Sequence, residues 1–374
     1  MRALFWVSCA VLAYSYLGYP LLVWILARLF GHEPAKQEML PLVSLLIPAY
    51  NEEAELARKL QNSVSLDYPA DRLEIVVASD GSTDDTEAIA RAWAPRVRLI
   101  AMSSHIGKAA MLRRVTPALP GEIVVFSDVS SELEPDALRA LVRNFSDDRV
   151  GCVSGLYRLK ASDDLRGQGE GLYWRYETWI KRQESRLHSI LGAHGAFYAI
   201  RRSLFPQLND ATINDDYLIP MRIVEQGYRA IYEPGARAWE REVASIHGEF
   251  ARRRRIAVGN CQQIKELASL LNPVRGWVAF CFVSHKVLRT FAPVAMLLAF
   301  LSSFWLPWPW SSAVLTLQTI FYAGAWAGYL CQRRGVTISW LSPPLYFCLG
   351  NLAMLAGLLR YCVGRQSAVW ERAK

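Results

Sequence analysis

The sequence has little charge and no closely spaced cysteines. Charged residues make up 20% of its 374 residues, against 52% hydrophobic residues. The seven cysteines are widely separated and none stands in a C-x-x-C pair. Neither a disulfide framework nor a zinc site is therefore indicated. We interpret the cysteines as small apolar side chains, buried in a protein of a reducing compartment.

Three long segments contain no charged side chain. They are Ala3–Ala27, Thr290–Gln332 and Gly335–Leu359, with 25, 43 and 25 residues. Because about 20 apolar residues cross the hydrocarbon of a bilayer, these lengths predict one span, two spans with a break, and one span. The break falls at Leu306–Trp310, where two prolines end a helix and the tryptophans suit a membrane interface. A purely soluble or secreted protein is disfavoured.

The first segment is a membrane anchor rather than a cleaved signal. A signal core has roughly 7 to 15 residues and ends in small residues. This segment is longer, is rich in Tyr, Trp and Leu, and ends at Trp24–Arg28 without such a site. We therefore predict that it stays in the protein.

Positive charge is distributed unevenly around the apolar segments. The net charge is +8, most Lys and Arg residues lie between the first two spans, and Arg333 and Arg334 follow the third. The bias of Lys and Arg towards the cytoplasm places both regions inside. Four simple spans would then put the C-terminal tail outside, although Arg360 and the later basic residues favour the inside. A re-entrant or interfacial segment at His285–Arg289 or at Pro343–Pro344 would resolve the conflict, and both alternatives stay open.

Between the first two spans, strand and helix patterns alternate. The predicted strands are Leu42–Ile47, Leu73–Ala78, Val97–Met102 and Glu122–Phe126, and the predicted helices are Glu52–Val64, a helix capped by Ser82–Asp85 that runs through Trp93, and Lys108–Val115. Buried strands separated by helices are typical of βαβ units around a parallel sheet. The sequence therefore predicts an α/β, Rossmann-like fold.

Acidic and polar side chains follow three of these strands. Asn51 and Glu52 follow the first, Asp80 the second and Asp128 the fourth. Ligands of such sheets bind beyond the carboxyl ends of the strands. A single aspartate there is often a helix cap, but three strand ends converge on one edge. Carboxylates suit ribose hydroxyls and hard divalent cations, and the sequence has no G-x-G-x-x-G or Walker motif to cradle phosphate. The pattern predicts a nucleoside diphosphate held through its ribose and a metal.

Seven motifs in order make the chain resemble the family-2 glycosyltransferases. They are Ile47–Glu52 (IPAYNE), Ser79–Asp84 (SDGSTD), Ile106–Ala109 (IGKA), Ser127–Asp128, Gly192–Phe197 (GAHGAF), Asn214–Tyr217 (NDDY) and the run Arg252–Arg255. The resemblance covers roughly residues 42–260. The flanking spans resemble those of the cellulose, hyaluronan and poly-N-acetylglucosamine synthase branch. The resemblance to this branch implies a GT-A catalytic domain that lies on the cytoplasmic face and uses nucleotide sugars.

The resemblance assigns nucleotide-binding roles by position. Tyr50 and Glu52 would border the uracil, and Asp80 would contact the uridine. Lys108 matches the lysine of the N-x-G-K element, with His105 where Asn is usual.

The resemblance also implies a cation, Mg²⁺ or Mn²⁺. Asp128 matches the first carboxylate of the D-x-D metal motif, whose second is replaced here by Ser130. Phosphate oxygens and water would complete the coordination shell.

The Q-x-x-R-W element of the family is altered here. It aligns with Arg252 to Ile256, so Arg stands for Gln and Ile256 for Trp. In the processive synthases that Trp lies at the acceptor site, so its loss argues against polymer extension but not against sugar transfer. Arg252 and Arg255 share a helix face and are candidates for the diphosphate or acceptor, with a membrane flank as the alternative.

Asp216 matches the aspartate of the family's E-D element, the presumed general base, and Asp215 stands in place of the glutamate. The alternative is that both are first-turn acids favoured by the helix dipole. His194 lies in a loop that the family places near the sugars. It is a candidate sugar contact rather than a metal ligand.

The leading interpretation is a multi-pass protein of the inner (plasma) membrane. It would be an inverting, hexosyltransferase-type enzyme, transferring a sugar from a UDP-sugar to a lipid-linked or polysaccharide acceptor in cell-surface glycan or exopolysaccharide synthesis. A processive synthase that also secretes its polymer and a non-catalytic membrane scaffold are the alternatives. Nucleic-acid binding is disfavoured because the basic residues flank spans. The predicted organisation is a transmembrane helix (3–30), the catalytic domain (40–245), basic interfacial helices (246–289), about three transmembrane helices (290–364) and a basic tail (365–374).

Overall fold

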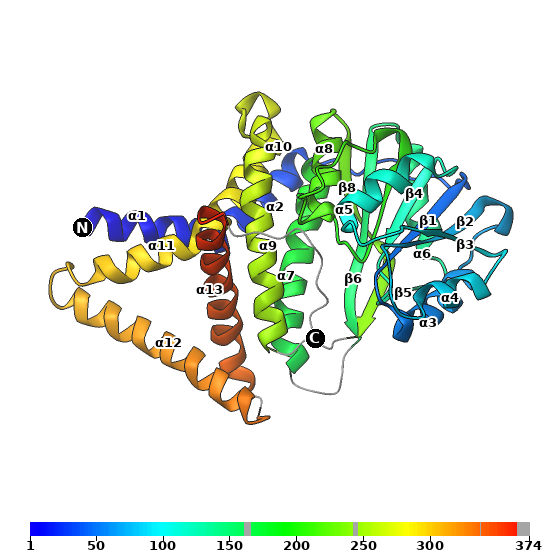
Figure 1. The fold of residues 1–374 in the computed structure, drawn as a ribbon. Coiled ribbons are helices and arrows are strands. Elements are labelled where there is room, and N and C mark those ends of the chain that lie inside the picture. The colour runs from blue at the N-terminus through cyan, green and yellow to red at the C-terminus, as the bar shows by residue number, and fades with distance from the viewer. Residues whose placement is uncertain (161–165, 242–245, 337, 365–374) are drawn as a thin grey trace.

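The computed structural model describes residues 1–160, 166–241, 246–336 and 338–364, so the predicted tail 365–374 lies outside the described residues. An α/β domain is on one side of the molecule, and helices from both ends of the chain are on the other (Figure 1).

The α/β domain begins after the first helices and follows the predicted alternation. Its strands are β1 (Val43–Ala49), β2 (Leu73–Ser79), β3 (Val97–Ala101), β4 (Ile123–Ser127), β5 (Ser131–Leu133), β6 (Val150–Lys160), β7 (Phe197–Arg201) and β8 (Arg229–Arg241). Its helices are α3 (Glu53–Val64), α4 (Thr86–Ala92), α5 (Lys108–Val115), α6 (Ala137–Val142), α7 (Arg166–Leu187) and α8 (Asp215–Glu225). The four predicted strands are confirmed to within two residues at each end.

One eight-stranded sheet joins the domain, in the order β3-β2-β1-β4-β7-β6-β8-β5. The first four strands are parallel, β7 is antiparallel to β4, and β8 is parallel to β6. The carboxyl ends of β1, β2 and β4 therefore meet at one edge, as the sequence predicts.

Helices cover both faces of the sheet. Successive side chains of a strand point to opposite faces, and in β1 Leu46 joins one buried cluster while Leu45 and Ile47 join the other. The first cluster includes residues of α5, α7 and α8, and the second includes residues of α3 and α6. All seven residues of β1 are buried, which explains its continuous apolar run.

The N-terminal helix enters the domain core. α1 (Arg2–Ala13), a π-helical turn (Tyr14–Gly18) and α2 (Tyr19–Phe30) follow one another without a break. Tyr19 and Val23 of α2 are fully buried in the same cluster as Ile180 of α7. The outer half, α1, packs instead on α11 (Leu288–Ser303).

Four helical segments of the described chain are long and apolar enough to cross a membrane. They are Arg2–Phe30, Trp277–Ser303, Trp310–Arg333 and Ser339–Cys362. The second contains α10 (Trp277–Cys281), a π-helical turn (Phe282–Val287) and α11, so its helix begins before the uncharged stretch at Thr290. α12 (Trp310–Arg333) starts directly after the proline-tryptophan break, which confirms the expected turn.

α9 (Ile246–Glu266) and α13 (Ser342–Cys362) lie side by side and run in the same direction. Both lie crosswise to α1 and α11, between these helices and the sheet (Figure 1). A Cβ atom added at Gly357 of α13 would lie 2.4 Å from the Ala257 Cβ of α9. The close approach therefore depends on a glycine.

Candidate active site

The loop before α5 is held by Asp80 at the end of β2. The backbone N–H groups of Ile106 and Gly107 donate to Asp80 Oδ1 and Oδ2 at 2.8 and 2.9 Å. His105 Nδ1 lies 2.9 Å from Oδ2, and Asp80 is 2% exposed. Both carboxylate oxygens thus have partners within the protein. Asp80 therefore holds this loop in position, and this role is additional to the uridine contact expected from the sequence.

Tyr50 and Glu52 follow β1 at the same edge. The Tyr50 ring stacks on the His105 ring, with centroids 3.9 Å apart. Asn51 between them has φ +54°, a left-handed conformation that asparagine tolerates. The backbone N–H of Glu52 donates to Thr86 Oγ1 at 2.7 Å. The two predicted nucleotide-binding loops are therefore joined, and Tyr50 presents a flat aromatic ring at the edge of the sheet.

Lys108 brings together the carboxylates that follow β4 and begin α8. Its Nζ lies 3.1 Å from Asp128 Oδ1 and 3.7 Å from Asp215 Oδ2. Burial alone would lower the pKa of Lys108, but the charges of Asp128, Asp215 and Asp216 outweigh it and raise the pKa. Lys108 is therefore a fixed positive charge among three carboxylates, and four predicted site residues form one cluster.

Asp216 contacts the glycine-rich loop that carries His194. The Gly195 N–H donates to Asp216 Oδ2 at 3.1 Å, and a Cβ at Gly195 would lie 3.0 Å from the same oxygen. Burial, and then the like charge of Asp215, raises the pKa of Asp216 to about 6, while Lys108 and Lys181 act in the opposite direction. A carboxylate with this pKa accepts a proton near neutral pH more readily than an ordinary aspartate.

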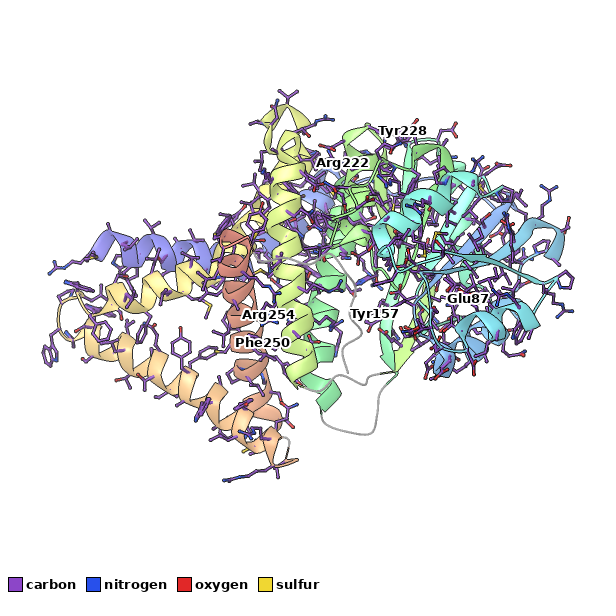
Figure 2. All side chains as sticks on the ribbon, viewed as in Figure 1. Glu87, Tyr157, Arg222, Tyr228, Phe250 and Arg254 are labelled. Atoms are coloured by element: carbon purple, nitrogen blue, oxygen red, sulfur yellow. The ribbon has the colours of Figure 1, made fainter. Side chains whose placement is uncertain are left out.

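His194 is buried and neutral. Burial, and then the positive charge of Lys181, lowers the pKa of His194 well below its ordinary value. Its ring stacks on Tyr157, which Figure 2 labels, with centroids 5.6 Å apart. A neutral ring fixed next to Asp216 suits a hydrogen bond to a sugar better than charge stabilisation.

Ser130, in the position of the missing second D-x-D carboxylate, contacts a carboxylate that sequence analysis missed. Its Oγ donates to Glu240 Oε1 at 2.5 Å, and the Tyr157 hydroxyl donates to Glu240 Oε2 at 2.5 Å. Glu240 is about 110 residues away along the chain, and no local motif marks it. The pairing of β5 with β8 brings it there.

Lys59 of α3 supports the Asp128 loop from inside the domain and was also missed. Its Nζ donates to Ser127 Oγ at 2.7 Å and to the Ser131 carbonyl at 2.8 Å. Burial lowers its pKa to about 7. In the sequence Lys59 is one of several charged residues on an amphipathic helix, and only its 1% exposure distinguishes it.

The predicted arginines lie on α9. Arg252 donates from Nε to Glu249 Oε2 at 2.9 Å, within its own helix, and Arg255 is exposed. These contacts place neither arginine in the carboxylate cluster, so their role towards a diphosphate remains a prediction.

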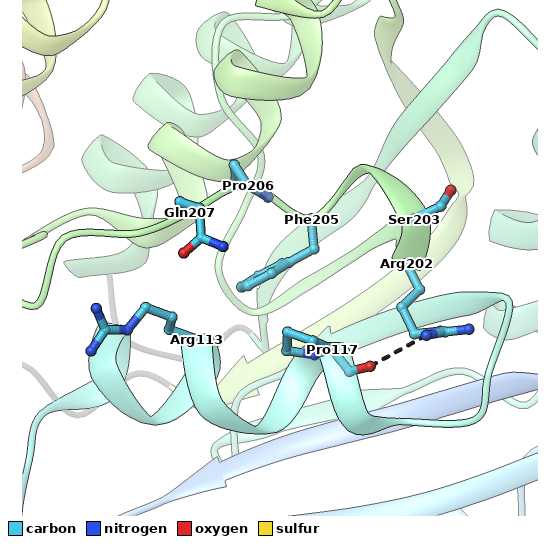
Figure 3. Close-up of a pocket in the computed structure, with 7 residues that line it drawn as sticks. All are labelled: Arg113, Pro117, Arg202, Ser203, Phe205, Pro206 and Gln207. Atoms are coloured by element: carbon cyan, nitrogen blue, oxygen red, sulfur yellow. Dashed lines mark hydrogen bonds between the residues drawn. The ribbon is translucent and has the colours of Figure 1, made fainter.

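A surface hollow of about 230 Å³ lies at the end of α5 (Figure 3). Arg113, Phe205 and Gln207 are among its lining residues, and Arg202 Nη1 donates to the Pro117 carbonyl at 3.3 Å. None of the predicted site residues lines it. The candidate active site is therefore the polar edge of the sheet and not this hollow.

Residues 44–208 match the family described as Glycosyl transferase family 2. This part of the chain is similar to the family-2 glycosyltransferases. The region includes Tyr50, Asp80, Lys108, Asp128 and the glycine loop, so the family resemblance seen in the motifs is confirmed.

Curated relatives extend this similarity without covering either partner fully. The chain is 30% identical over 233 residues to a probable glycosyltransferase, YdaM, of Bacillus subtilis, covering 59% of this chain and 56% of that protein. It is 28% identical over 216 residues to a beta-monoglucosyldiacylglycerol synthase of Nostoc, with coverages of 55% and 46%. It is 25% identical over 224 residues to a poly-beta-1,6-N-acetyl-D-glucosamine synthase of Staphylococcus epidermidis, with coverages of 58% and 54%. The chain thus spans about half the length of these relatives.

A solved structure is similar over nearly the whole chain. The mannosyltransferase PcManGT of Pyrobaculum calidifontis, in complex with GDP-Man and Mn²⁺, matches with a TM-score of 0.72 and 23% identity. The match covers 97% of this chain and all of the other. The predicted fold, a GT-A domain flanked by apolar helices, is confirmed.

Proposed function

We propose that the protein is a membrane-bound inverting glycosyltransferase. It transfers a hexosyl group from a nucleotide sugar, expected to be a UDP-sugar, to a lipid-linked or glycan acceptor at the cytoplasmic face of the plasma membrane. The observation that best supports this proposal is the position of Asp216 beside Lys108, Asp128 and Asp215, in a domain that matches family 2. A binding scaffold would not require a carboxylate with a pKa near neutrality among these charges.

The chemistry assigns one step to Asp216. An acceptor hydroxyl oxygen attacks the anomeric carbon of the donor sugar from the face opposite the nucleotide. The bond from that carbon to the diphosphate oxygen breaks, the bonding electrons leave with the diphosphate, and the hydroxyl proton passes to Asp216. The sugar configuration is thereby inverted. The Gly195 N–H fixes one Asp216 oxygen, so the other is available for the proton.

Lys108 and Asp128 serve the departing diphosphate. Asp128 offers oxygen atoms of the kind that Mg²⁺ and Mn²⁺ prefer, but no group of three His, Cys, Asp or Glu side chains is placed for a metal in the described ranges. Asp128 would therefore be the one protein carboxylate that holds the cation, and the donor diphosphate and water would complete its coordination shell. When bound, the cation offsets charge on the leaving group. Lys108 supplies a permanent positive charge at the same edge.

Stacking on the flat Tyr50 ring does not select one base over another. The UDP preference comes from the motif resemblance, whereas the similar archaeal structure contains GDP-Man. Purified protein in detergent should be incubated with UDP- and GDP-sugars, and nucleotide release measured with Asp216→Asn as the control. Release from UDP-sugars by the wild type alone supports the proposal. No release from any donor would contradict it.

The packing of α13 supports a topology of three spans rather than four. α9 contains Arg252–Arg255, Glu249 and Lys265, so it is too polar to lie in hydrocarbon. α13 follows α9 along its length, from Gly350 near Arg253 to Gly357 at Ala257. This contact with a polar helix favours a position of α13 at the membrane surface, although α13 also packs on α11 and α12. The predicted re-entrant or interfacial segment at Pro343–Pro344 is therefore favoured, with the tail inside.

Reporter fusions test this topology. Alkaline phosphatase, active only outside the cytoplasm, should be active when fused after Trp308 and inactive when fused after Arg334 or Gly364. Green fluorescent protein should give the opposite pattern. Phosphatase activity after Gly364 would instead make α13 a fourth span.

A single transfer is favoured over processive synthesis by Arg252 and Ile256, which replace the Gln and Trp of the processive motif. Incubation with labelled donor followed by electrophoresis of the product separates the two. A ladder of increasing length would show polymer extension.

A further inference from the structure

Five ionisable side chains meet where the second candidate span joins the α/β domain. Glu177 and Glu184 come from α7, while His285, Lys286 and Arg289 come from the span. His285 Nδ1 lies 2.6 Å from Glu184 Oε1, and Arg289 Nη1 lies 2.5 Å from Glu177 Oε1. Both glutamates are buried. The two glutamates are thus ion-pair partners of His285 and Arg289, whereas the third basic side chain, Lys286, contacts neither of them.

Lys286 turns towards the predicted general base. Its Nζ donates to Asn260 Oδ1 at 2.7 Å and lies 3.4 Å from the centre of the Tyr217 ring. Tyr217 directly follows Asp216, and the charge that acts most strongly on Lys286 is the Asp216 carboxylate. Within the described ranges Lys286 forms no ion pair. A span residue thus brings positive charge to the reaction centre.

Lys181 brings a second positive charge to the same place. It is 8% exposed, and its Nζ donates to the Gly192 carbonyl at 3.2 Å, in the loop that contacts Asp216. Its charge acts on both Asp216 and His194. Like Lys286, it has no ion-pair partner among the residues that the structure describes. Glu177 and Glu184 act on Lys181 more strongly than Asp216 does, but no printed ion-pair contact joins them to it. Lys181 and Lys286, the lysine pair, therefore lie near Asp216 with no carboxylate in direct contact within the described residues.

Buried ammonium groups with no carboxylate in direct contact are costly, and an anionic ligand relieves that cost. The donor diphosphate already has Lys108 and the Asp128 edge, so the second anion belongs to the acceptor. Because Lys286 comes from a candidate membrane span, the acceptor reaches it from the lipid side. We propose that the lysine pair binds the phosphate of a lipid acceptor and sets its hydroxyl beside Asp216. This inference rests on the proposed glycosyltransferase function.

Farnesyl phosphate and farnesol make a matched pair of probes, because they differ only in the phosphate. Binding to the full-length protein in detergent is measured by the shift of its thermal unfolding midpoint, without donor. Inorganic phosphate is the third probe. We expect farnesyl phosphate to bind at least about tenfold more tightly than farnesol, as a charge-assisted hydrogen bond predicts. Inorganic phosphate should bind more weakly than farnesyl phosphate.

Three variants connect this preference to the lysine pair. Lys286→Met keeps an apolar stem and removes the charge, so the preference for farnesyl phosphate should fall to about the farnesol level. Lys286→Arg should retain most of it. Lys265→Met, which removes an exposed lysine of α9, is the matched control and should bind as the wild type does.

Equal binding of farnesyl phosphate and farnesol by the wild type would overturn the proposal, as would a preference that survives in Lys286→Met. Inorganic phosphate binding as tightly as farnesyl phosphate would assign the site to free phosphate and refute a lipid acceptor. Nucleotide release from donor without lipid tests the transferase function separately. A protein that releases nucleotide but shows no phosphate preference contradicts only the acceptor site. One that shows the preference but releases no nucleotide contradicts the enzymatic proposal.

Discussion

The ionisation of Asp216 predicts the pH dependence of transfer. Its pKa of about 6 results from burial and Asp215, opposed by Lys108 and Lys181. As the proposed general base, Asp216 must be deprotonated to act, so the rate should increase with pH through the pKa. About one tenth of the carboxylate is ionised at pH 5 and about nine tenths at pH 7 for this pKa, which gives roughly a tenfold rise in rate.

Two neighbouring charges should move this acid limb in opposite directions. Asp215→Asn removes the like charge that raises the Asp216 pKa, so the limb should move to lower pH. Lys108→Met removes the positive charge that lowers it, so the limb should move to higher pH. Initial rates with saturating donor and acceptor, measured as nucleotide release from pH 4.5 to 8, give both midpoints.

Asp216→Asn should remove the limb and slow transfer by about a hundredfold to ten-thousandfold, the usual contribution of general-base assistance. Donor affinity, measured by calorimetry, should change little because the proposal places the diphosphate near Lys108 rather than Asp216. The thermal unfolding midpoint at each pH controls for loss of structure. A limb that persists in Asp216→Asn, or shifts in the same direction in both charge variants, would refute the assignment.

Three further predictions concern the surrounding structure. Chelation by EDTA should abolish transfer, and added Mn²⁺ or Mg²⁺ should restore it. The Asp128→Asn variant should need at least about tenfold more metal for half its maximal rate, since even a residue that only supports a metal ligand contributes that much to metal affinity. The same metal requirement in the variant and the wild type would exclude Asp128 as a ligand. Lys59→Met should lose transfer because the Asp128 loop loses its support. The pKa of Lys59 in the folded protein is lowered to about 7, so the unfolded chain binds more protons, and the stability of the wild type relative to this variant should rise between about pH 7 and 10. A difference in unfolding midpoint that stays constant over this pH range would contradict this prediction. Gly192→Ala, at φ +83°, places a Cβ 2.4 Å from the Tyr217 ring, whereas the Cβ of Gly227→Ala, at φ +94°, meets no atom within 4 Å. Gly192→Ala should therefore lower the thermal unfolding midpoint more than Gly227→Ala. An equal decrease in both variants would mean that only backbone strain, on the order of 1–3 kcal/mol, is responsible.

Local patterns in the sequence were enough to predict the first half of the sheet. The strands from Val43 to Ser127 are continuous apolar runs, and the acidic residues after them meet because parallel strands end at one edge. The antiparallel half was harder, since β5 has three residues and pairs with β8 from about 100 residues away. Non-local pairing leaves no periodic signal near either strand.

The charged contacts around Asp216 could not be derived from spacing either. Lys181 and Lys286 are separated by 105 residues in sequence and approach the same carboxylate only in three dimensions. One signal was available, because a lysine inside a candidate span is usually functional or paired. The positions of Glu177 and Glu184 decide that His285 and Arg289 form ion pairs with them and that Lys286 does not.

The continuity of α1 and α2 has a consequence for how this enzyme can be handled. A fragment that begins near residue 40 would lose Tyr19 and Val23, both fully buried, and would expose the apolar surface of α7 that they cover. It would also lose the Tyr19 hydroxyl, which donates to Glu184 at 2.6 Å, and leave that buried carboxylate with fewer partners. The N-terminal helix is therefore part of the folded core of the α/β domain, and we expect a fragment without it to be less stable than the full chain.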